Sequence, residues 1–290
     1  MILYFDNGKN PFTRFFSACG ERIVMPYNRR LKIKIIRKLE KFPLLWRFLY
    51  NKKSIVPEPG ETMIVFDSNI SGAFLQWLRN SFPDNRIIFW YWNPVSTTIK
   101  PEQIPSGIEK WSYSPEDCEK YGMKYNTTFF FDTLLPSEKY IHVTGKKVLF
   151  VGRDKGRLSE LLNWKNTLER EGLQCDFYII GSHVSPEYSI KTELSYDEVV
   201  RLVQKSDYII DYYTDPMAGL SLRPLEAMFF EKKLITNNVT IRNYDFYSDH
   251  NIFICQDGFD GIRDFIAKPY QSVNKKIRER YLFSFWRSSF

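Results

Sequence analysis

Short apolar runs alternate with amphipathic stretches along most of the chain, beginning near Glu61. Runs rich in β-branched and aromatic residues predict strands, and apolar residues at three- and four-residue spacing predict helices between them. In the first half the pattern predicts strands at 63–66, 86–92, 110–113 and 127–131, with helices at 72–82 and 115–121. In the second half it predicts strands at 148–151, 177–180, 208–210, 233–236 and 252–254, with helices at 158–171, 196–204 and 224–230.

Strict alternation of strand and helix is typical of parallel sheets with crossover helices. The expected fold class is α/β, with two Rossmann-like, doubly wound domains whose ligands bind at the carboxyl ends of the strands. We place the first domain at 1–140, the second at 147–265, and a helical tail at 266–290. The tail is basic and aromatic, and it either packs back on the first domain or forms a membrane contact. The segment 132–146 has Gly and Pro breakers and is the expected linker.

The composition narrows the class of protein. With 290 residues, 43% of them hydrophobic, the chain can bury one large core or two ordinary ones, which excludes intrinsic disorder. Four cysteines are scattered singly, away from any Cys/His ligand spacing, so neither a metal site nor a disulfide framework is expected. Apolar runs fall far short of the roughly 20 residues of a membrane span, and the amino terminus lacks a signal-peptide core. We therefore expect a cytoplasmic protein.

Positive charge is concentrated in the first 60 residues, which contain 13 Lys and Arg against 4 Asp and Glu. Their net charge is +9, whereas the whole chain carries +7. In the basic amphipathic segment 29–53, one helical stripe is apolar (Leu31, Ile35, Leu39) and another is basic (Lys34, Lys38, Lys41). Such a segment either lies flat on an anionic leaflet or packs its apolar side on its own domain. The first alternative predicts a peripheral contact with the inner face of the cell membrane.

The loop after the strand 148–151 carries three cations, Arg153, Lys155 and Arg157, between Gly152 and the next helix. It lacks the GxGxxG fingerprint that holds a dinucleotide through backbone N–H groups. Cationic side chains beside a helix amino terminus suit a diphosphate, because Arg grips phosphate oxygens bidentately and Lys acts as a point charge. The alternative is an ordinary surface loop with glycine turns.

A second loop, 215–223, follows the strand 208–210 and leads into a helix that we expect to begin at Pro224. Arg223 then lies at the mouth of this helix and Glu226 in its first turn. A carboxylate there either accepts hydrogen bonds from the two hydroxyls of a ribose or only complements the helix dipole.

The two loops, in this order along the chain, are the motifs on which a resemblance to a known family rests. The stretch from Lys147 to about Cys255 resembles the nucleotide-sugar-binding half of GT-B glycosyltransferases, most closely the short bacterial enzymes of lipopolysaccharide and capsular polysaccharide biosynthesis. The resemblance implies two Rossmann-like domains that face a cleft. It also implies transfer of a sugar from a nucleotide-diphosphate sugar to a lipid-linked or lipopolysaccharide acceptor at the cytoplasmic face of the membrane.

The same resemblance implies roles for individual residues. Arg153 and Lys155 would bind the donor diphosphate, with Arg157 and Arg223 as helpers, and Glu226 would bind the nucleotide ribose. The donor loops would be completed by Gly152, Gly219 and Ser221.

Two departures from the family pattern leave questions open. Many retaining members carry two glutamates eight positions apart, and Ala218 stands at the first of these positions, so Asp215 is the only substitute in that loop. The first-loop cations are also closer together than in the family, which leaves the choice between Lys155 and Arg157 open.

The chain has no DxD motif, so we expect transfer without a metal or cofactor, with cations stabilising the departing diphosphate. An inverting reaction also needs a base for the proton of the acceptor hydroxyl. Asp67, just after the strand 63–66, is the first candidate. The alternative role for Asp67 is that of a turn residue whose side chain caps backbone groups of residues 68–70. Glu21 and Asp6 are weaker candidates.

Other readings stay open on the sequence alone. A pI of about 9.0 motivates a nucleic-acid-binding module, but no nucleic-acid motif occurs and no such partner is expected. A dinucleotide oxidoreductase is the second alternative, but the chain lacks the glycine fingerprint of that class. A non-catalytic membrane-associated scaffold would keep its function without Arg153 and Glu226. Three tryptophans either stack on an acceptor sugar or pack in the core (Trp90, Trp92, Trp111).

Overall fold

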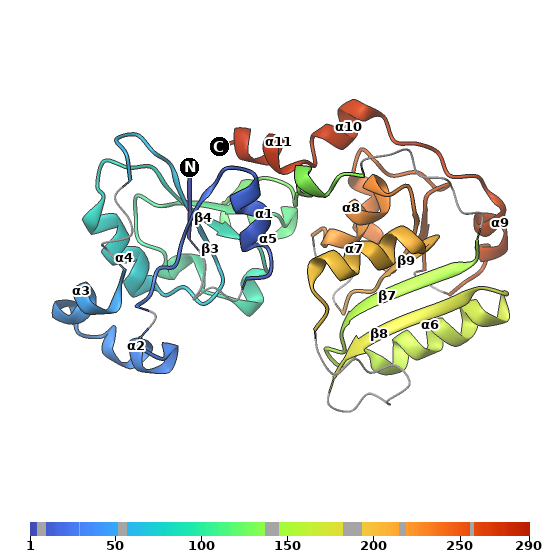
Figure 1. Cartoon of the computed structure of the whole chain (residues 1–290), viewed down its shortest axis with the longest axis horizontal. Helices are drawn as coiled ribbons and strands as arrows, with labels where there is room; N and C mark the ends of the chain where they lie inside the picture. The colour runs from blue at the N-terminus through green and yellow to red at the C-terminus, as the bar shows by residue number, and fades with distance from the viewer. Residues whose placement is uncertain are drawn as a thin grey trace. The chain divides into compact units, whose positions relative to one another are not determined.

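The structure is a computed structural model of the whole chain (Figure 1). It describes every residue except 5–9, 29, 52–56, 137–144, 182–192, 215–218 and 256–257. The chain divides into two compact units, Met1–Thr127 and Thr128–Phe290. Each is built on a parallel sheet, so the expected α/β class is confirmed. The division falls before the segment 132–146 that we expected as the linker, so residues from Thr128 onward belong to unit 2.

Unit 1 holds six parallel strands in the order β2-β1-β3-β4-β5-β6. They are β1 (Ile2–Tyr4), β2 (Arg22–Val24), β3 (Met63–Phe66), β4 (Ile87–Tyr91), β5 (Glu109–Ser112) and β6 (Lys124–Tyr125). Every residue of β3 and β4 is buried, as expected for the inner strands of a parallel sheet covered on both faces. The first strand lies between the second and the third, so the topological switch point of this unit is between β1 and β3.

The helices of unit 1 follow the predicted pattern after residue 60 and add to it before. They are α1 (Thr13–Ala18), α2 (Ile33–Leu39), α3 (Trp46–Leu49), α4 (Gly72–Ser81) and α5 (Pro115–Tyr121). Ser71 caps α4, because its hydroxyl accepts a hydrogen bond from the Phe74 N–H at 3.1 Å. Phe74, Leu75 and Leu78 on α4 are buried in the core that lies against the sheet.

The basic segment 29–53 does not present the apolar stripe that we expected. Ile36 is fully buried and Leu39 packs on the core, whereas Ile35 is 45% exposed. The prediction that Leu31, Ile35 and Leu39 share one stripe was therefore wrong for Ile35, because Ile36 is the residue of α2 that enters the core. Part of the segment therefore packs its apolar residues on its own unit, as one of the two alternatives predicted. Its residues Arg29, Lys52 and Lys53 lie outside the described part of the chain.

Unit 2 holds five parallel strands in the order β11-β10-β9-β7-β8. They are β7 (Lys147–Arg153), β8 (Gln174–Ile180), β9 (Tyr208–Asp211), β10 (Lys233–Thr236) and β11 (Ile252–Ile254). Counted from its first strand, unit 2 has the same order as unit 1, with the first strand β7 between the second and the third. Its switch point therefore lies between β7 and β9.

Helices cover both faces of the unit 2 sheet (Figure 1). The helices of unit 2 are α6 (Leu158–Arg170), α7 (Tyr196–Lys205), α8 (Leu222–Phe229), α9 (Ile262–Ala267), α10 (Lys275–Glu279) and α11 (Phe283–Ser288). Figure 1 shows α6 on one side of β7 and β8, with α7 and α8 on the other. Apolar side chains of α6 and α9 share one core cluster with those of the strands. No helix in the described part of the chain is both long and apolar enough to cross a membrane.

The stretch that we expected as a strand at 127–131 lies outside both sheets. Phe130 forms an isolated bridge with Leu282, in which Phe130 N donates to Tyr281 O (2.7 Å) and Phe283 N donates to Phe130 O (2.8 Å). The Trp286 ring of α11 lies 4.5 Å from that of Phe129, between centroids. The tail therefore packs on residues that we assigned to the first domain and that belong to unit 2.

Candidate functional site

The candidate site of unit 2 lies where the chain leaves β7 and β9, at the switch point. These strands are paired at Val148 with Tyr208 and at Leu149 with Ile209, and the pairing stops two residues before the end of β9. Their carboxyl ends therefore part, which is where ligands bind in open α/β sheets. Both predicted loops start here.

The first loop is a tight turn between β7 and α6. We had expected the loop to begin at Gly152. Instead β7 runs through Arg153, so Gly152 and Arg153 are strand residues. The Asp154 side chain caps α6, because its Oδ1 accepts from the N–H groups of Arg157 (3.0 Å) and Leu158 (2.9 Å). Lys155 has a left-handed backbone with φ of 51°, and an exposed side chain at the tip of the turn.

Arg157 points inward and joins the ends of the two strands. Its guanidinium donates to the backbone oxygen of Tyr212, just after β9, and to that of Arg153 at 3.2 Å. The guanidinium carbon lies 5.2 Å from the centre of the Phe150 ring. The residue is only 7% exposed, and burial together with the charge of Arg223 lowers its pKa to about 10.

Arg223 bridges the same gap from the second loop. Its Nη2 donates to Val151 O of β7 at 2.7 Å, and its Nη1 lies 3.3 Å from Asp211 Oδ1 at the end of β9. Its guanidinium carbon is 5.3 Å from the centre of the Phe150 ring. The two predicted loops therefore meet, with two guanidinium groups on one aromatic ring.

Gly152 leaves the space that these guanidinium groups need. A Cβ at this position would lie 2.8 Å from Arg223 Nη2, 3.2 Å from Phe150 Cζ and 3.3 Å from Arg157 Nη2. Any larger residue would have to displace them, so the glycine serves close approach rather than backbone–phosphate contact.

Asp211 is the acidic residue that balances this cluster, and sequence reasoning missed it. It is buried, and its Oδ1 accepts from the hydroxyl of Ser221 at 3.0 Å as well as from Arg223. Burial raises the pKa of this carboxyl, while Arg223 and neighbouring hydroxyls oppose the rise. The sequence did show an aspartate at the end of an apolar strand, which could have marked Asp211 as a candidate. Its partner Arg223 could not be predicted from the sequence.

Arg153 and Lys155 carry the exposed charges of the site. Arg153 Nη2 lies 3.0 Å from Glu193 Oε2, and both side chains are more than half exposed. Burial and the charges of Arg157, Arg223 and Arg153 lower the pKa of Lys155, in that order. Arg157 and Arg223 share the Phe150 ring, Arg157 is bonded to the backbone oxygen of Arg153, and Lys155 lies in the turn between Arg153 and Arg157. We call these four residues the cationic cluster.

The second loop differs from the prediction at its helix start. α8 begins at Leu222 with Ser221 as its N-cap, two residues before the expected start at Pro224. Glu226 is therefore in the second turn, so the interpretation that it complements the dipole from the first turn was wrong. Gly219 is buried, and Asp215 and Ala218 lie outside the described residues.

Glu226 faces the interior of unit 2. It is 4% exposed, and its Oε1 accepts a hydrogen bond from the Tyr196 hydroxyl of α7 at 2.8 Å. Burial raises the pKa of this carboxyl, against the opposing influence of Arg223. Its role with a ribose stays a prediction.

In unit 1, Asp67 lies at the carboxyl end of β3 and is 5% exposed. Its Oδ2 accepts from the Asn93 N–H at 2.9 Å and its Oδ1 from the Asn93 amide at 3.0 Å. The contacts that hold it come from Asn93 and not from the turn 68–70 that we weighed as the alternative. Burial raises its pKa to about 7, a value suited to a general base.

The other candidates for a base are less favourably placed. Glu21 precedes β2 and so lies at the amino edge of a parallel sheet, opposite the edge that holds Asp67. Asp6 lies outside the described residues. Trp90 and Trp111 are buried in the core, whereas Trp92 is half-buried and stacks on Phe12 with centroids 5.4 Å apart.

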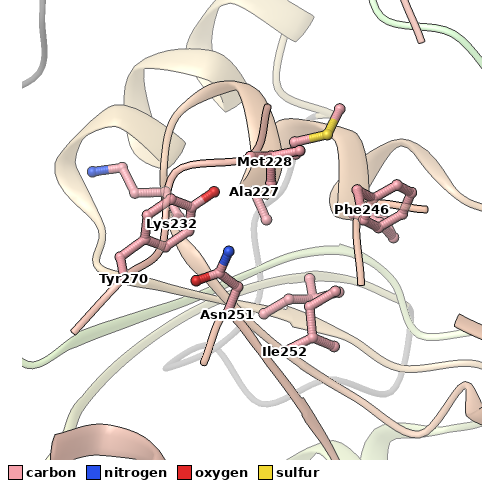
Figure 2. Close-up of a pocket in the computed structure, with 10 residues that line it drawn as sticks. Ala227, Met228, Lys232, Phe246, Asn251, Ile252 and Tyr270 are labelled. Atoms are coloured by element: carbon pink, nitrogen blue, oxygen red, sulfur yellow. The ribbon is translucent and has the colours of Figure 1, made fainter. Parts of the chain in front are cut away.

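Two cavities of unit 2 lie away from the cationic cluster. One, of about 10 Å³, is enclosed by α8, β10 and β11. Figure 2 shows Ala227, Met228, Phe246 and Ile252 around it, next to Asn251, whose amide is bonded to the backbone of Gln271. A space of this size holds no more than about one water, so it is a gap in the packing.

The other cavity, of about 520 Å³, is at the opposite, amino edge of the sheet. Lys232 and Lys233 line it, but their ammonium groups are committed to the fold. Lys233 Nζ donates to Phe265 O at 2.5 Å, and Lys232 Nζ donates to Gln204 O at 3.0 Å. Burial lowers the pKa of Lys233 to about 8. Across the residues that the structure describes, no three His, Cys, Asp or Glu side chains gather in a way that could hold a metal ion.

Comparison with known proteins adds little to this geometry. No protein-family model matches the chain, and no curated protein matches it. Among solved structures, one match is the NAD⁺-bound 3-phosphoglycerate dehydrogenase of Entamoeba histolytica, at 11% sequence identity. It covers 92% of this chain and 90% of the other, with a TM-score of 0.22, which is too low to carry an argument on fold or activity.

Proposed function

We propose that the protein is a glycosyltransferase of the GT-B type, which takes a sugar from a nucleotide-diphosphate sugar held at the cationic cluster. The convergence of four cations at the switch point of unit 2, from the end of β7, the turn after it and the start of α8, carries the proposal. Two of them, Arg157 and Arg223, are fixed by backbone oxygens and Asp211, so they are preorganised before a ligand arrives. Arg153 and Lys155 are exposed and can reach a diphosphate.

The proposed reaction needs the charge that this cluster supplies. The bond between the anomeric carbon and the diphosphate oxygen breaks, and the diphosphate leaves with the electron pair. Fixed cations stabilise the developing negative charge, and they require no reorganisation at that moment. The acceptor hydroxyl forms the new bond to the anomeric carbon and gives its proton to a base, for which we propose Asp67. The acceptor in this proposal is a lipid-linked or lipopolysaccharide glycan.

The donor site can be tested by thermal shift with UDP-, GDP-, CMP- and dTDP-sugars on the full chain. A ligand that binds only the folded form raises the melting temperature. We expect a shift with at least one donor, and a loss of affinity of at least about tenfold in each of Arg153→Ala and Lys155→Ala, because a hydrogen bond to a charged group contributes about 1.5–3 kcal/mol. Arg170→Ala on α6 and Lys276→Ala on α10 are matched controls, since both are exposed and outside the cluster.

Several outcomes would contradict the proposal. These are the absence of any shift, a shift with NAD⁺ alone, or equal effects of cluster and control variants. Glu226→Gln separates the roles within the site, because it changes the carboxylate assigned to the ribose and keeps all four cations. It should weaken sugar nucleotides but leave the binding of inorganic diphosphate unchanged.

A further inference from the structure

Exposed apolar side chains are concentrated in one short segment of unit 1. Among the residues described, seven large hydrophobic side chains are exposed, and four of them lie between residues 35 and 48. They are Ile35 (45% exposed), Phe42 (49%), Leu44 (88%) and Phe48 (56%). Single exposed apolar residues are ordinary, but a cluster on one short segment marks an interaction site. This segment comprises α2, α3 and the 3-10 helix η1 (Pro43–Leu45) between them.

The same segment carries five exposed cations. They are Lys32, Lys34, Lys38, Lys41 and Arg47. Lys41 Nζ lies 5.0 Å from the ring centre of Phe42, and the guanidinium carbon of Arg47 lies 4.6 Å from that of Phe48. We call these nine residues the basic-apolar surface. None of its five cations forms an ion pair with a described residue, so their charge is available to a partner.

The remaining polar residues of the segment hold it in place. Glu40 is buried, and its carboxylate accepts from Arg37 (3.0 Å) and from the hydroxyl of Ser71 (2.7 Å). The Trp46 indole N–H donates to Glu40 O at 2.7 Å. On the inner side, Ile36 is fully buried in the core of unit 1. The fold thus uses Arg37 and the inner apolar residues, and leaves the basic-apolar surface without a role inside the unit.

We propose that the basic-apolar surface docks on an anionic lipid bilayer, with Leu44 and Phe48 in the boundary between headgroups and acyl chains. A membrane satisfies both halves of this surface, because acyl chains take the apolar side chains and lipid phosphates take the cations. Nucleic acid would use the cations but would offer nothing to Leu44 or Ile35. The inference stands on unit 1 alone and does not depend on donor binding by unit 2.

Cosedimentation of the full chain with vesicles tests this docking. We expect binding to phosphatidylcholine vesicles that contain phosphatidylglycerol, weaker binding to pure phosphatidylcholine, and release at high salt. Leu44→Ser with Phe48→Ser should lower the partition coefficient at least about 100-fold, since each large apolar side chain contributes roughly 1.5 kcal/mol or more when buried. Lys34→Gln with Lys38→Gln should lower it roughly 30-fold at low salt, at about 1 kcal/mol per cation.

Matched controls are available in the same chain. Leu135→Ser removes an exposed apolar residue of unit 2 outside the tail, and Lys100→Gln with Lys120→Gln removes two exposed cations of unit 1. Both controls should bind vesicles as the unchanged protein does, with unaltered melting temperatures for all variants. The proposal is overturned if the unchanged protein does not bind anionic vesicles, if control and surface variants lose binding equally, or if DNA retains the protein while vesicles do not. Donor-induced thermal shifts, measured without vesicles, are unaffected by any of these results.

Discussion

Asp67 of unit 1 and Asp211 of unit 2 occupy equivalent places in two sheets of the same strand order. Each lies at the carboxyl end of the third strand of its unit, which pairs with the first strand. Both are buried, and burial raises the pKa of both carboxyls. Their partners differ, because Asp67 is held by the amide groups of Asn93, whereas Asp211 faces the guanidinium of Arg223.

This difference extends to the surroundings of each aspartate. Near Asp67 the residues that end β3 and β4 are aromatic, and Phe66 and Trp92 lie 5.1 Å apart between ring centroids. Near Asp211 lies the cationic cluster, whose members come from the end of β7, the turn after it and the start of α8. The strand order determines where a ligand site can form, and the side chains at that edge decide which charge it accepts. The proposal accordingly places the diphosphate on unit 2, whereas unit 1 offers a carboxyl with a pKa of about 7.

The largest expected effect concerns Asp67 and pH. Its pKa rises from an ordinary value of 3.8 to about 7 in the fold. Because the folded state binds this proton more tightly, the associated stability is complete below pH 3.8 and is lost as the pH rises through about 7. The free energy of unfolding should fall by about 4 kcal/mol at most over this window. Urea unfolding from pH 4 to pH 8 measures it.

Asp67→Asn isolates this contribution, because buried Asp211 and Glu226 also have raised pKa values and titrate in the same direction. The difference in unfolding free energy between the protein and this variant should change steadily across the window. A difference that stays constant from pH 4 to pH 8 would show that Asp67 is ionised in the fold at low pH, and would remove it as a general base.

Asp211→Ala probes the other member of the pair. It leaves the partly buried guanidinium of Arg223 without its acidic partner, and breaking such a pair destabilises a protein by about 3 kcal/mol. The loss should be visible as a lower urea midpoint of unit 2. Asp260→Ala, on an exposed aspartate of the same unit, should change stability by less than about 0.5 kcal/mol. Equal effects of the two substitutions would mean that Asp211 does not organise the cluster.

The strands that end near Asp67 and Asp211 were predictable from the sequence, but the hydrogen-bond partners of the side chains at their ends were not. β3, β4, β7 and β9 are continuous apolar runs, which a parallel sheet buries on both faces. The bond between Asp67 and Asn93 spans 26 positions, and that between Val151 and Arg223 spans 72, so both depend on the register of strands that only the folded sheet fixes. The approach of the two loops followed from topology, but the inward turn of Arg157 and Arg223 did not.

Short elements were the other weakness of prediction from the pattern. β1 and β2 have three residues each and β6 has two, too few for an alternation to stand out, although β1 lies inside its sheet. In α2, Ile36 turns inward and Ile35 outward, although the spacing had grouped Ile35 with Leu39. A helix of seven residues is positioned by its neighbours more than by its own periodicity, and here Glu40 and Ser71 provide that positioning.

Gly152→Ala has the smallest expected effect and tests the difference between the two sheet edges. Unit 2 needs this glycine only if the guanidinium groups of Arg157 and Arg223 must lie over Phe150. The added Cβ would meet Arg223 Nη2 at 2.8 Å and Phe150 Cζ at 3.2 Å. We expect a loss of about 2 kcal/mol in stability from overpacking, with weaker binding of inorganic diphosphate. Adding Arg223→Lys removes the clashing Nη2 group, so the double variant should regain part of the stability but none of the diphosphate affinity. If diphosphate binds the single variant as tightly as it binds the unchanged protein, the positions of these guanidinium groups are irrelevant to the anion, and the functional distinction between the two sheet edges fails.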